Sequence, residues 1–256
     1  MKFRYRLAQY FSNAIERRAE RVIVERFPVL YRDIADYRTH SPSTGCTYAD
    51  YLAHYTWIRR HKPREILECG TGVSTVVLAR ALMENEKEHG TPWRLVSMEE
   101  NPSYYEAALA CLPAHLKSDS RLEMVLSEAV EDTYEFFRGV RYKDVPKGAY
   151  DLVFVDGPDF MINPGRTPLT FDFDFLKIVQ DSERPVSAFI DTRMSTCFIY
   201  SLLFPGKVRY DFLRRIGIVA PVTRRDLADA KTIVSRAMEA RAFRRPPLKK
   251  LITGVY

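Results

Sequence analysis

The fold is decided by residues 66–75, Ile-Leu-Glu-Cys-Gly-Thr-Gly-Val-Ser-Thr. Residues 64–67 are expected to form a short buried strand, and residues 73–83 place apolar side chains at helical spacing. A strand, a tight glycine turn and a helix make the geometry of a nucleotide-type cofactor site. Gly70 and Gly72 let the backbone turn sharply and let a ligand approach without meeting a Cβ atom.

An acid two positions before the first glycine, Glu68, indicates which ligand fits. A dinucleotide carries a pyrophosphate, which binds N–H donors and positive potential and would be repelled by this carboxylate. The dinucleotide fingerprint also requires a third glycine, which this turn lacks. S-adenosylmethionine has no phosphate, and a carboxylate complements its ammonium and sulfonium, directly or through water. The alternative is a glycine turn that serves only to join a strand to a helix.

The same stretch resembles motif I of the class I S-adenosylmethionine-dependent methyltransferases, written E/D-x-G-x-G. The resemblance extends over residues 40–220, because further motifs follow in the family's order. It implies that S-adenosyl-L-methionine is the cofactor. The residues of this stretch that it implies for cofactor binding are Glu68, Gly70, Thr71, Gly72, Ser74 and Thr75.

The composition suits a folded chain in a reducing compartment. The 256 residues are 46% hydrophobic and 12% aromatic, with a net charge of +6 that permits an acidic partner without requiring one. The four cysteines are scattered, with no metal-type or disulfide-type spacing. No apolar run is long enough for a membrane span, and no signal peptide is evident. We therefore expect a cytoplasmic protein.

The expected organisation is an N-terminal amphipathic helical arm over residues 1–39, a methyltransferase-like domain over residues 40–240, and a basic tail over residues 241–256. The arm has an apolar stripe over residues 3–27 and a polar face rich in arginine. Such a helix can lie on an anionic membrane surface, on its own domain or on a second subunit of a homo-oligomer. Thr47 is the expected N-cap of a helix over residues 48–61.

Two further strands supply expected cofactor contacts. Glu99 follows the apolar run at residues 93–98, where a carboxylate can accept hydrogen bonds from both ribose hydroxyls. After the next strand, the sequence Ser127, Glu128 and Ala129 resembles the Gly-Asp-Ala turn that borders the adenine in this family, with serine in place of glycine.

Two strands end in aspartates. Asp156, followed by Gly-Pro, ends an apolar run at residues 150–155, and Asp191-Thr192-Arg193 ends another at residues 185–190. The resemblance implies that Asp156 also borders the cofactor and that Asp156 and Asp191 orient or deprotonate an acceptor hydroxyl, with Arg193 nearby. In metal-dependent O-methyltransferases the second pair is Asp-Asn, so the resemblance implies a magnesium ion on Asp156, Asp191 and Thr192. Threonine is a weaker neutral ligand than asparagine.

The alternation of strands and helices predicts an α/β fold: a doubly wound, mostly parallel, seven-stranded Rossmann-like sheet with an antiparallel closing hairpin at residues 207–220. A short helix over residues 131–137 and a basic loop over residues 138–147 are also expected. The predicted function is O-methylation of a small-molecule or glycan-type hydroxyl, with no nucleic-acid partner. Two alternatives remain: an NAD-dependent oxidoreductase, and a non-catalytic Rossmann-like protein that binds a membrane or anionic partner through its arm and tail.

Overall fold

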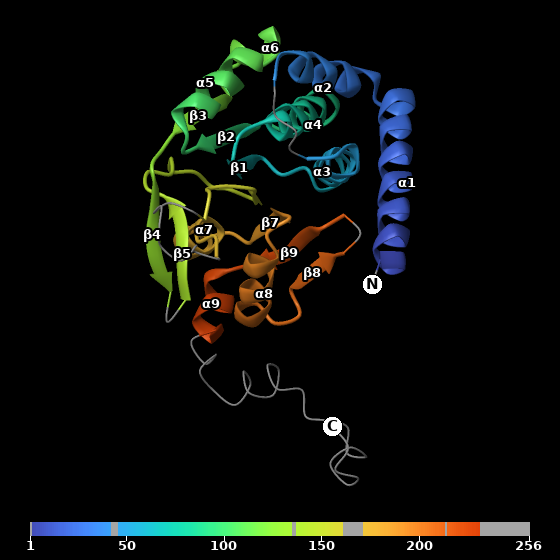
Figure 1. Cartoon of the computed structure of the whole chain (residues 1–256). Coiled ribbons are helices and arrows are strands. Elements are labelled where there is room, and N and C mark those ends of the chain that lie inside the picture. The colour runs from blue at the N-terminus through green and yellow to red at the C-terminus, as the bar shows by residue number, and fades with distance from the viewer. Residues whose placement is uncertain (1, 42–45, 135–136, 161–170, 213, 231–256) are drawn as a thin grey trace.

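A seven-stranded sheet forms the centre of the computed structural model, which describes residues 2–41, 46–134, 137–160, 171–212 and 214–230 (Figure 1). The strand order is β3-β2-β1-β6-β7-β9-β8. The strands are β1 (Glu65–Cys69), β2 (Arg94–Glu99), β3 (Leu122–Leu126), β6 (Leu152–Val155), β7 (Val186–Asp191), β8 (Val208–Asp211) and β9 (Ile216–Val222).

The first five strands of this sheet run parallel, and the closing hairpin β8–β9 runs antiparallel. The strand order reverses at β1, which pairs with β2 on one side and with β6 on the other. Ligands of doubly wound sheets bind at the carboxyl ends of the strands beside such a reversal. The predicted fold class is therefore confirmed, and it places the glycine turn at that edge.

Side chains of β1 alternate between two buried cores. Ile66 belongs to the core under α3 (Tyr48–His61) and α4 (Val73–His89), and Leu67 belongs to the core under α7 (Asp174–Asp181) and α8 (Met194–Leu203). Glu68 therefore points toward the α4 side. Helix α4 begins immediately after the glycine turn and ends at Gly90, which has a left-handed conformation.

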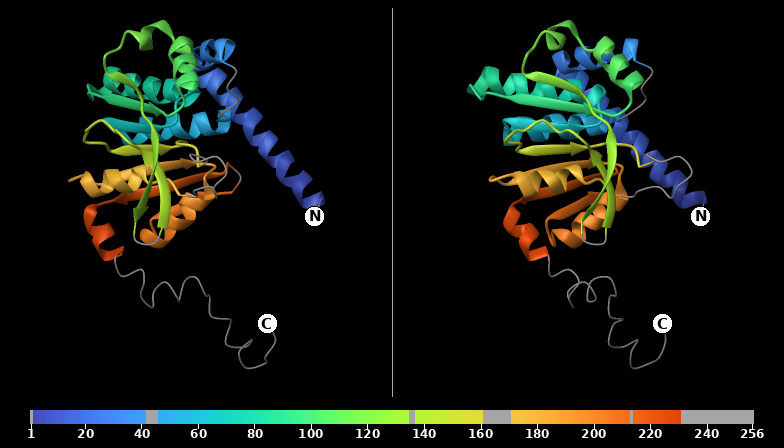
Figure 2. Two further views of the ribbon diagram at one scale, coloured as in Figure 1. Left: turned by 60° about the vertical axis from the view of Figure 1, so that its left-hand side comes forward. Right: turned by 90° about the vertical axis from the view of Figure 1, so that its left-hand side faces the viewer.

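Three helices precede the sheet: α1 (Lys2–Arg26), α2 (Pro28–His40) and α3. Figure 2 shows α1 running obliquely along one side of the molecule, with its N-terminal end projecting past the other elements. Its Ala19 and Ile23 are buried, and Glu16 accepts hydrogen bonds from the backbone N–H groups of Tyr48 and Ala49. The second half of α1 is thus fixed to the first turn of α3. Thr47 is the N-cap of α3, as predicted.

The segment expected as a short helix and a loop is instead a β-hairpin. Strands β4 (Ala129–Tyr134) and β5 (Phe137–Tyr142) pair antiparallel in a separate sheet. Cross-strand ion pairs join Glu131 to Arg138 and Asp132 to Arg141, and these contacts stabilise only the paired form. The prediction of a helix over residues 131–137 is therefore wrong, and the predicted basic loop is confirmed only over residues 143–147.

The remaining helices are α5 (Pro102–Cys111), α6 (Ala114–Lys117) and α9 (Arg224–Ala230). The expected basic tail over residues 241–256 lies outside the described residues. No described helix has the length and apolar character that a bilayer span requires.

One buried histidine of α3 lacks polar partners. His54 is fully buried between the rings of Phe154 and Phe189, with ring centroids 4.7 and 5.0 Å away. Neither ring nitrogen has a hydrogen-bond partner among the described residues. Burial lowers the pKa of His54 to about 3, so the folded protein holds the ring neutral.

We expect His54→Leu to stabilise the fold by about 1–3 kcal/mol at pH 7.5, because it removes two unsatisfied buried polar atoms. Below pH about 6.5, His54 binds a proton in the unfolded wild-type chain but stays neutral in the folded chain. Wild-type stability therefore falls as pH drops toward 3. The gain from the substitution should therefore be about 2 kcal/mol larger at pH 5. Urea unfolding at pH 7.5 and at pH 5 measures the gain in stability. An equal gain at both pH values would contradict the lowered pKa of His54.

Candidate functional site

A cavity of about 620 Å³ opens at the carboxyl ends of β1, β2, β6 and β7. Its volume lies within the range of small-molecule sites. A larger cleft of about 810 Å³ lies between α1, α3 and β9, and none of the predicted site residues lines it. The first cavity is lined by Gly70, Thr71, Glu99, Glu100, Tyr104, Asp156, Gly157, Asp159, Phe160, Thr192, Arg193, Met194 and Ser195.

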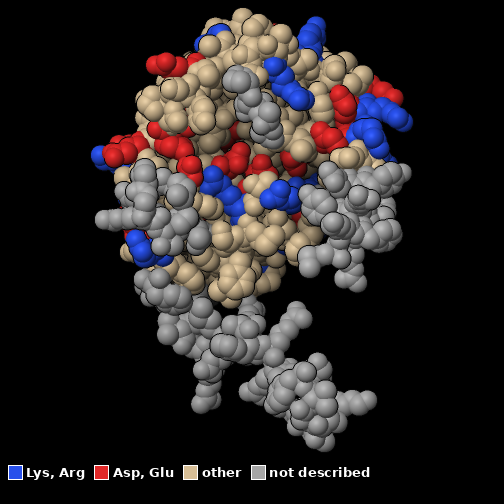
Figure 3. All heavy atoms as spheres, viewed as in Figure 1, with Lys and Arg blue, Asp and Glu red and all other residues tan. Residues whose placement is uncertain are grey.

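Carboxyl groups dominate the charge of this cavity. Glu99, Glu100, Asp156 and Asp159 line it, against one guanidinium, that of Arg193. In Figure 3 acidic side chains also form a band across the middle of one face of the molecule, although the net charge of the chain is positive. Such a lining repels a pyrophosphate and attracts a cation.

The two motif glycines serve different purposes. Gly70 has a φ of 95°, and a Cβ there would lie 3.0 Å from the backbone nitrogen of Gly157. The turn is therefore fixed by close packing of the ends of β1 and β6, and any side chain at position 70 would be strained. A Cβ on Gly72 would meet only Ser74 Oγ, at 4.0 Å. Among the described residues the space in front of Gly72 is open, as a bound ligand requires.

Glu68 lies beneath the turn and is fully buried. Its Oε2 accepts a hydrogen bond from Thr75 Oγ1 at 2.6 Å, and Thr75 Oγ1 in turn accepts one from the Gly72 N–H. Its Oε1 has no hydrogen-bond partner among the described residues. Burial raises the pKa of Glu68 to about 7, and the nearby hydroxyl groups only partly offset this. The structure thus joins Glu68, Thr75 and the turn in one network. Contact of these residues with the cofactor stays a prediction.

Both acids at the end of β2 reach the cavity. Glu99 Oε1 accepts from the Asn101 N–H at 3.0 Å, and burial raises the pKa of its carboxyl. Glu100, which the sequence analysis did not single out, accepts from Tyr142 Oη and from the Asp159 N–H. It therefore ties the end of β2 to the β5 hairpin and to the segment after β6. Only tertiary contacts distant in sequence give Glu100 this place.

The expected adenine turn lies outside the cavity lining. Ser127 is buried, with its Oγ accepting from the Asp144 N–H at 3.0 Å. Glu128 is exposed and pairs with Lys143, and Ala129 begins β4. The backbone N–H of Ser127 donates to the Glu99 carbonyl, so the turn holds the end of β2. A contact with adenine stays a prediction.

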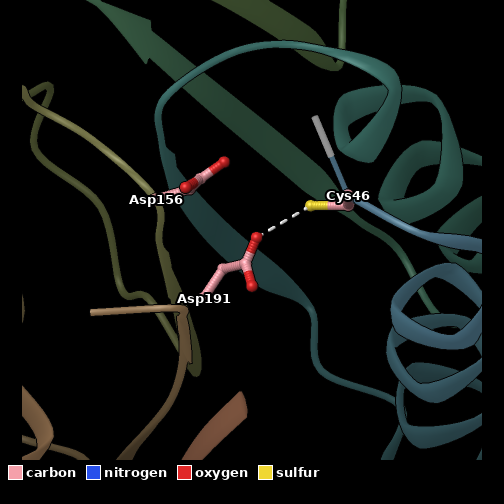
Figure 4. A group of neighbouring side chains, drawn as sticks. All are labelled: Cys46, Asp156 and Asp191. Atoms are coloured by element: carbon pink, nitrogen blue, oxygen red, sulfur yellow. Dashed lines mark hydrogen bonds between the residues drawn. The ribbon is translucent and has the colours of Figure 1, made fainter. Parts of the chain in front are cut away.

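The two predicted aspartates come together with a cysteine that the sequence argument overlooked. Figure 4 shows Cys46, Asp156 and Asp191 converging from the loop before α3 and the ends of β6 and β7. Cys46 Sγ donates to Asp191 Oδ2 at 3.1 Å, and one donor atom from each residue lies within 4.8 Å of the others. Burial, reinforced by the neighbouring Asp156, raises the pKa of Asp191 to about 7. No spacing signal links position 46 to positions 156 and 191, since only folding brings them together.

The Arg193 side chain makes its hydrogen bonds and its ion pair with other groups of the protein. Its guanidinium donates to the carbonyls of Asp156 and Pro158 and forms an ion pair with the fully buried Asp172. Its face lies 4.6 Å from the Phe160 ring centroid. It thus joins the end of β6 to β7 and to residue 172. A role of Arg193 in the chemical step stays a prediction.

A magnesium ion does not fit this cluster well. Asp156 and Asp191 offer oxygens, but the third donor atom of the cluster is the sulfur of Cys46, and Mg²⁺ prefers oxygen ligands in octahedral geometry. Thr192 is exposed on the cavity rim, with its N–H donating to the Arg215 carbonyl and its carbonyl accepting from Met194. The magnesium set of Asp156, Asp191 and Thr192 stays a prediction.

Comparisons with known proteins agree with the fold. Residues 67–161 match the family model described as a methyltransferase domain. An O-methyltransferase from Bacillus cereus, solved in complex with SAH, is 15% identical, with 80% of this chain and 97% of that one covered and a TM-score of 0.50. A SAH-bound Podospora anserina methyltransferase is 16% identical, covering 85% and 79%, with a TM-score of 0.43. No curated protein sequence matches the chain.

The fold and the acid-lined edge define a Rossmann-like α/β protein with a site for a small, positively charged ligand. The match over residues 67–161 likens this part of the chain to a methyltransferase domain.

We expect Arg193→Met to destabilise the fold by about 3–5 kcal/mol, because Asp172 would stay buried without its charge partner. The matched control Arg138→Met breaks an exposed ion pair and should cost less than about 1 kcal/mol. The double variant Arg193→Met, Asp172→Asn should recover part of the loss. Denaturant unfolding measures the free energy of unfolding of all three variants. Equal losses in the two single variants would contradict the stabilising role of Arg193.

Proposed function

We propose that the chain transfers a methyl group from S-adenosylmethionine to a hydroxyl group of a small molecule. The supporting observation is the acid-lined cavity where the glycine turn meets Asp156. The cavity lies at the strand reversal, and its charge suits a cofactor that is cationic and has no phosphate. The same charge disfavours an NAD-dependent oxidoreductase, because NAD carries a pyrophosphate.

Residues at the ends of β1 and β2 would hold the cofactor. The turn at residues 70–72 leaves open space for its methionine end, and the Glu68–Thr75 network fixes that turn from below. Oε1 of Glu68 is buried without a partner among the described residues, and an ammonium reached through water would satisfy it. Glu99, which lines the cavity, would accept from the ribose hydroxyls. When bound, the cofactor supplies a methyl group already activated by its sulfonium.

Asp156 and Asp191 would act on the acceptor. Asp191 Oδ2 is held by the Cys46 thiol, while Oδ1 is buried and has no partner among the described residues. With a pKa of about 7, this carboxylate can take the hydroxyl proton near neutral pH. Burial, and after it the charge of Asp156, keeps the pKa of Asp191 in that range. Arg193 would act as a positioning residue, since it fixes the backbone of residues 156 and 158.

The proposed acceptor is a hydroxyl group of a small molecule or of a glycan. The pair of carboxyls supports a hydroxyl acceptor, and the Bacillus cereus protein of the same fold is described as an O-methyltransferase. A nucleic-acid acceptor is disfavoured, because the cavity presents carboxylates where phosphates would have to lie. A glycan-type hydroxyl remains within the proposed class. Contact of α1 with a membrane, or with a second copy of the chain, stays a prediction.

Cofactor choice is tested by calorimetric titration with S-adenosylmethionine and with NAD. We expect the wild type to bind only the former, and Gly72→Leu to weaken that binding at least about tenfold by filling the open space. Position 72 has extended backbone, so the variant should unfold like the wild type. The matched variant Gly70→Ala should instead lose about 1–2 kcal/mol of stability. NAD binding without S-adenosylmethionine binding would overturn the proposal.

The base is tested by incubating the enzyme with S-adenosylmethionine and a panel of phenols, catechols and sugars, with S-adenosylhomocysteine measured by mass spectrometry. The rate should rise with pH through about 7, because Asp191 accepts a proton only when ionised. Asp191→Asn should lower the rate about 100-fold or more while leaving cofactor affinity unchanged. The control Asp181→Asn alters an exposed acid and should have no effect. Full activity in the Asp191→Asn variant would refute the assignment.

A further inference from the structure

A cavity of about 670 Å³ lies at the opposite edge of the sheet from the acid-lined cavity. It is formed by the end of α3, the segments that lead into β1, β6 and β7, and the hairpin β8–β9. Its volume is in the range of small-molecule sites. No described residue lines both cavities, so the two are separate sites.

Basic side chains dominate the lining of this cavity, which we call the basic cavity. The described residues that line it include a single acid, Asp151, and the cations Lys62, Arg64, Arg184, Lys207 and Arg209. Asp151 Oδ2 already accepts hydrogen bonds from the backbone N–H groups of Arg64 and Glu65, at 2.7 and 3.2 Å. Its Oδ1 lies 3.5 Å from the Arg184 guanidinium. A net positive charge therefore remains in a concave space, where low-dielectric walls concentrate the field.

Among the described residues, three of these cations lack a partner. The side chains of Lys62, Arg64 and Arg209 are exposed and form no hydrogen bond or ion pair with another described residue. The other two, Arg184 and Lys207, donate to backbone carbonyls. Like charges that share a cavity repel one another, and a bound anion offsets that repulsion. Guanidinium groups also match the geometry of phosphate oxygens.

The basic cavity also has an apolar wall. Trp57 of α3 stacks on His61 with ring centroids 4.1 Å apart, and Ile218 of β9 lines the same cavity. A Cβ on Gly206 would meet no described atom within 4 Å, so the space in front of the turn before β8 is open. The lining therefore suits a ligand with a multiply charged end and an organic body.

We propose that the basic cavity binds a small organic polyphosphate. Its free phosphate end lies among Lys62, Arg64 and Arg209, and its organic body lies against Trp57. Several unpartnered cations require several negative charges, which a terminal polyphosphate carries and a single carboxylate does not. NAD does not meet this requirement, since its pyrophosphate has an organic group on both sides and no free end. The site does not depend on the proposed function, because it shares no lining residue with the acid-lined cavity.

The test is calorimetric titration of the full-length protein with magnesium-free ATP and with inorganic triphosphate at low salt. We expect one equivalent of ATP to bind, at least about fivefold more tightly than inorganic triphosphate, because its organic body adds contact with the apolar wall. Added salt should weaken both. The double variant Lys62→Gln, Arg64→Gln should weaken ATP binding at least about tenfold. The matched control Arg17→Gln, Arg21→Gln removes the same charge from exposed positions outside the cavity and should keep it.

Tryptophan fluorescence locates the bound ATP. The chain has two tryptophans, and Trp93 is buried and does not line the basic cavity. ATP should therefore change the emission of the wild type but not that of Trp57→Phe. If the double variant does not fold, Arg209→Gln on β8 provides the same loss of affinity from another element.

Four results would overturn the proposal. They are a wild-type protein that does not bind ATP, equal ATP affinity in the double variant and its control, an emission change that persists in Trp57→Phe, and tighter binding of a single-stranded oligonucleotide than of ATP. The last result would assign this surface to a nucleic acid, which contacts a protein through many phosphates along its length.

Discussion

Close backbone packing between Gly70 and Gly157 is the contact on which the site depends. The N–H groups of Asp156 and Gly157 both donate to the Cys69 carbonyl, and a Cβ on either glycine would lie about 3 Å or less from the other's backbone. Only two residues without side chains allow β1 and β6 to end this close together. The turn that faces the cofactor and the aspartate that faces the acceptor are therefore positioned by the same contact.

This packing also concentrates negative charge. Parallel strands end at one edge of the sheet, and in this chain β1, β2, β6 and β7 each carry an acid at or near that end: Glu68, Glu99, Asp156 and Asp191. Among the described residues that line the cavity, the one cationic side chain is that of Arg193, which is engaged by Asp172 and by carbonyls. The field at the edge thus remains negative, and it favours a cationic ligand over a phosphate.

Short-range patterns predicted most of the fold. Apolar runs gave the strands of the main sheet, and Thr47 and Gly72 marked the starts of α3 and α4. The helix expected over residues 131–137 failed because β4 is stabilised by pairing with β5, and helical spacing of a few apolar residues carries no information about a partner strand. Local sequence also could not place Asp172, whose ion pair with Arg193 spans 21 residues.

The site shows the same division between local and distant contacts. Motif residues at the ends of β1, β2, β6 and β7 reached the predicted edge because a parallel sheet leaves them no other place. Cys46 and Glu100 were missed, since the first depends on how the loop before α3 crosses the ends of β6 and β7, and the second on contacts with Tyr142 and Asp159. Resemblance to a family predicts site residues only at the positions that the family's motifs include.

The buried acids link the site to the stability of the whole fold. Burial raises the pKa of Glu68 and of Asp191 to about 7, so the folded chain binds protons that the unfolded chain releases above pH about 4. Stability is therefore lost as pH rises from about 4 to about 7, where these groups must ionise in the folded state. A cationic ligand reverses this loss, because it binds the ionised acids of the folded chain and stabilises that state by mass action. The cost of keeping these acids buried is thus the source of the site's preference for positive charge.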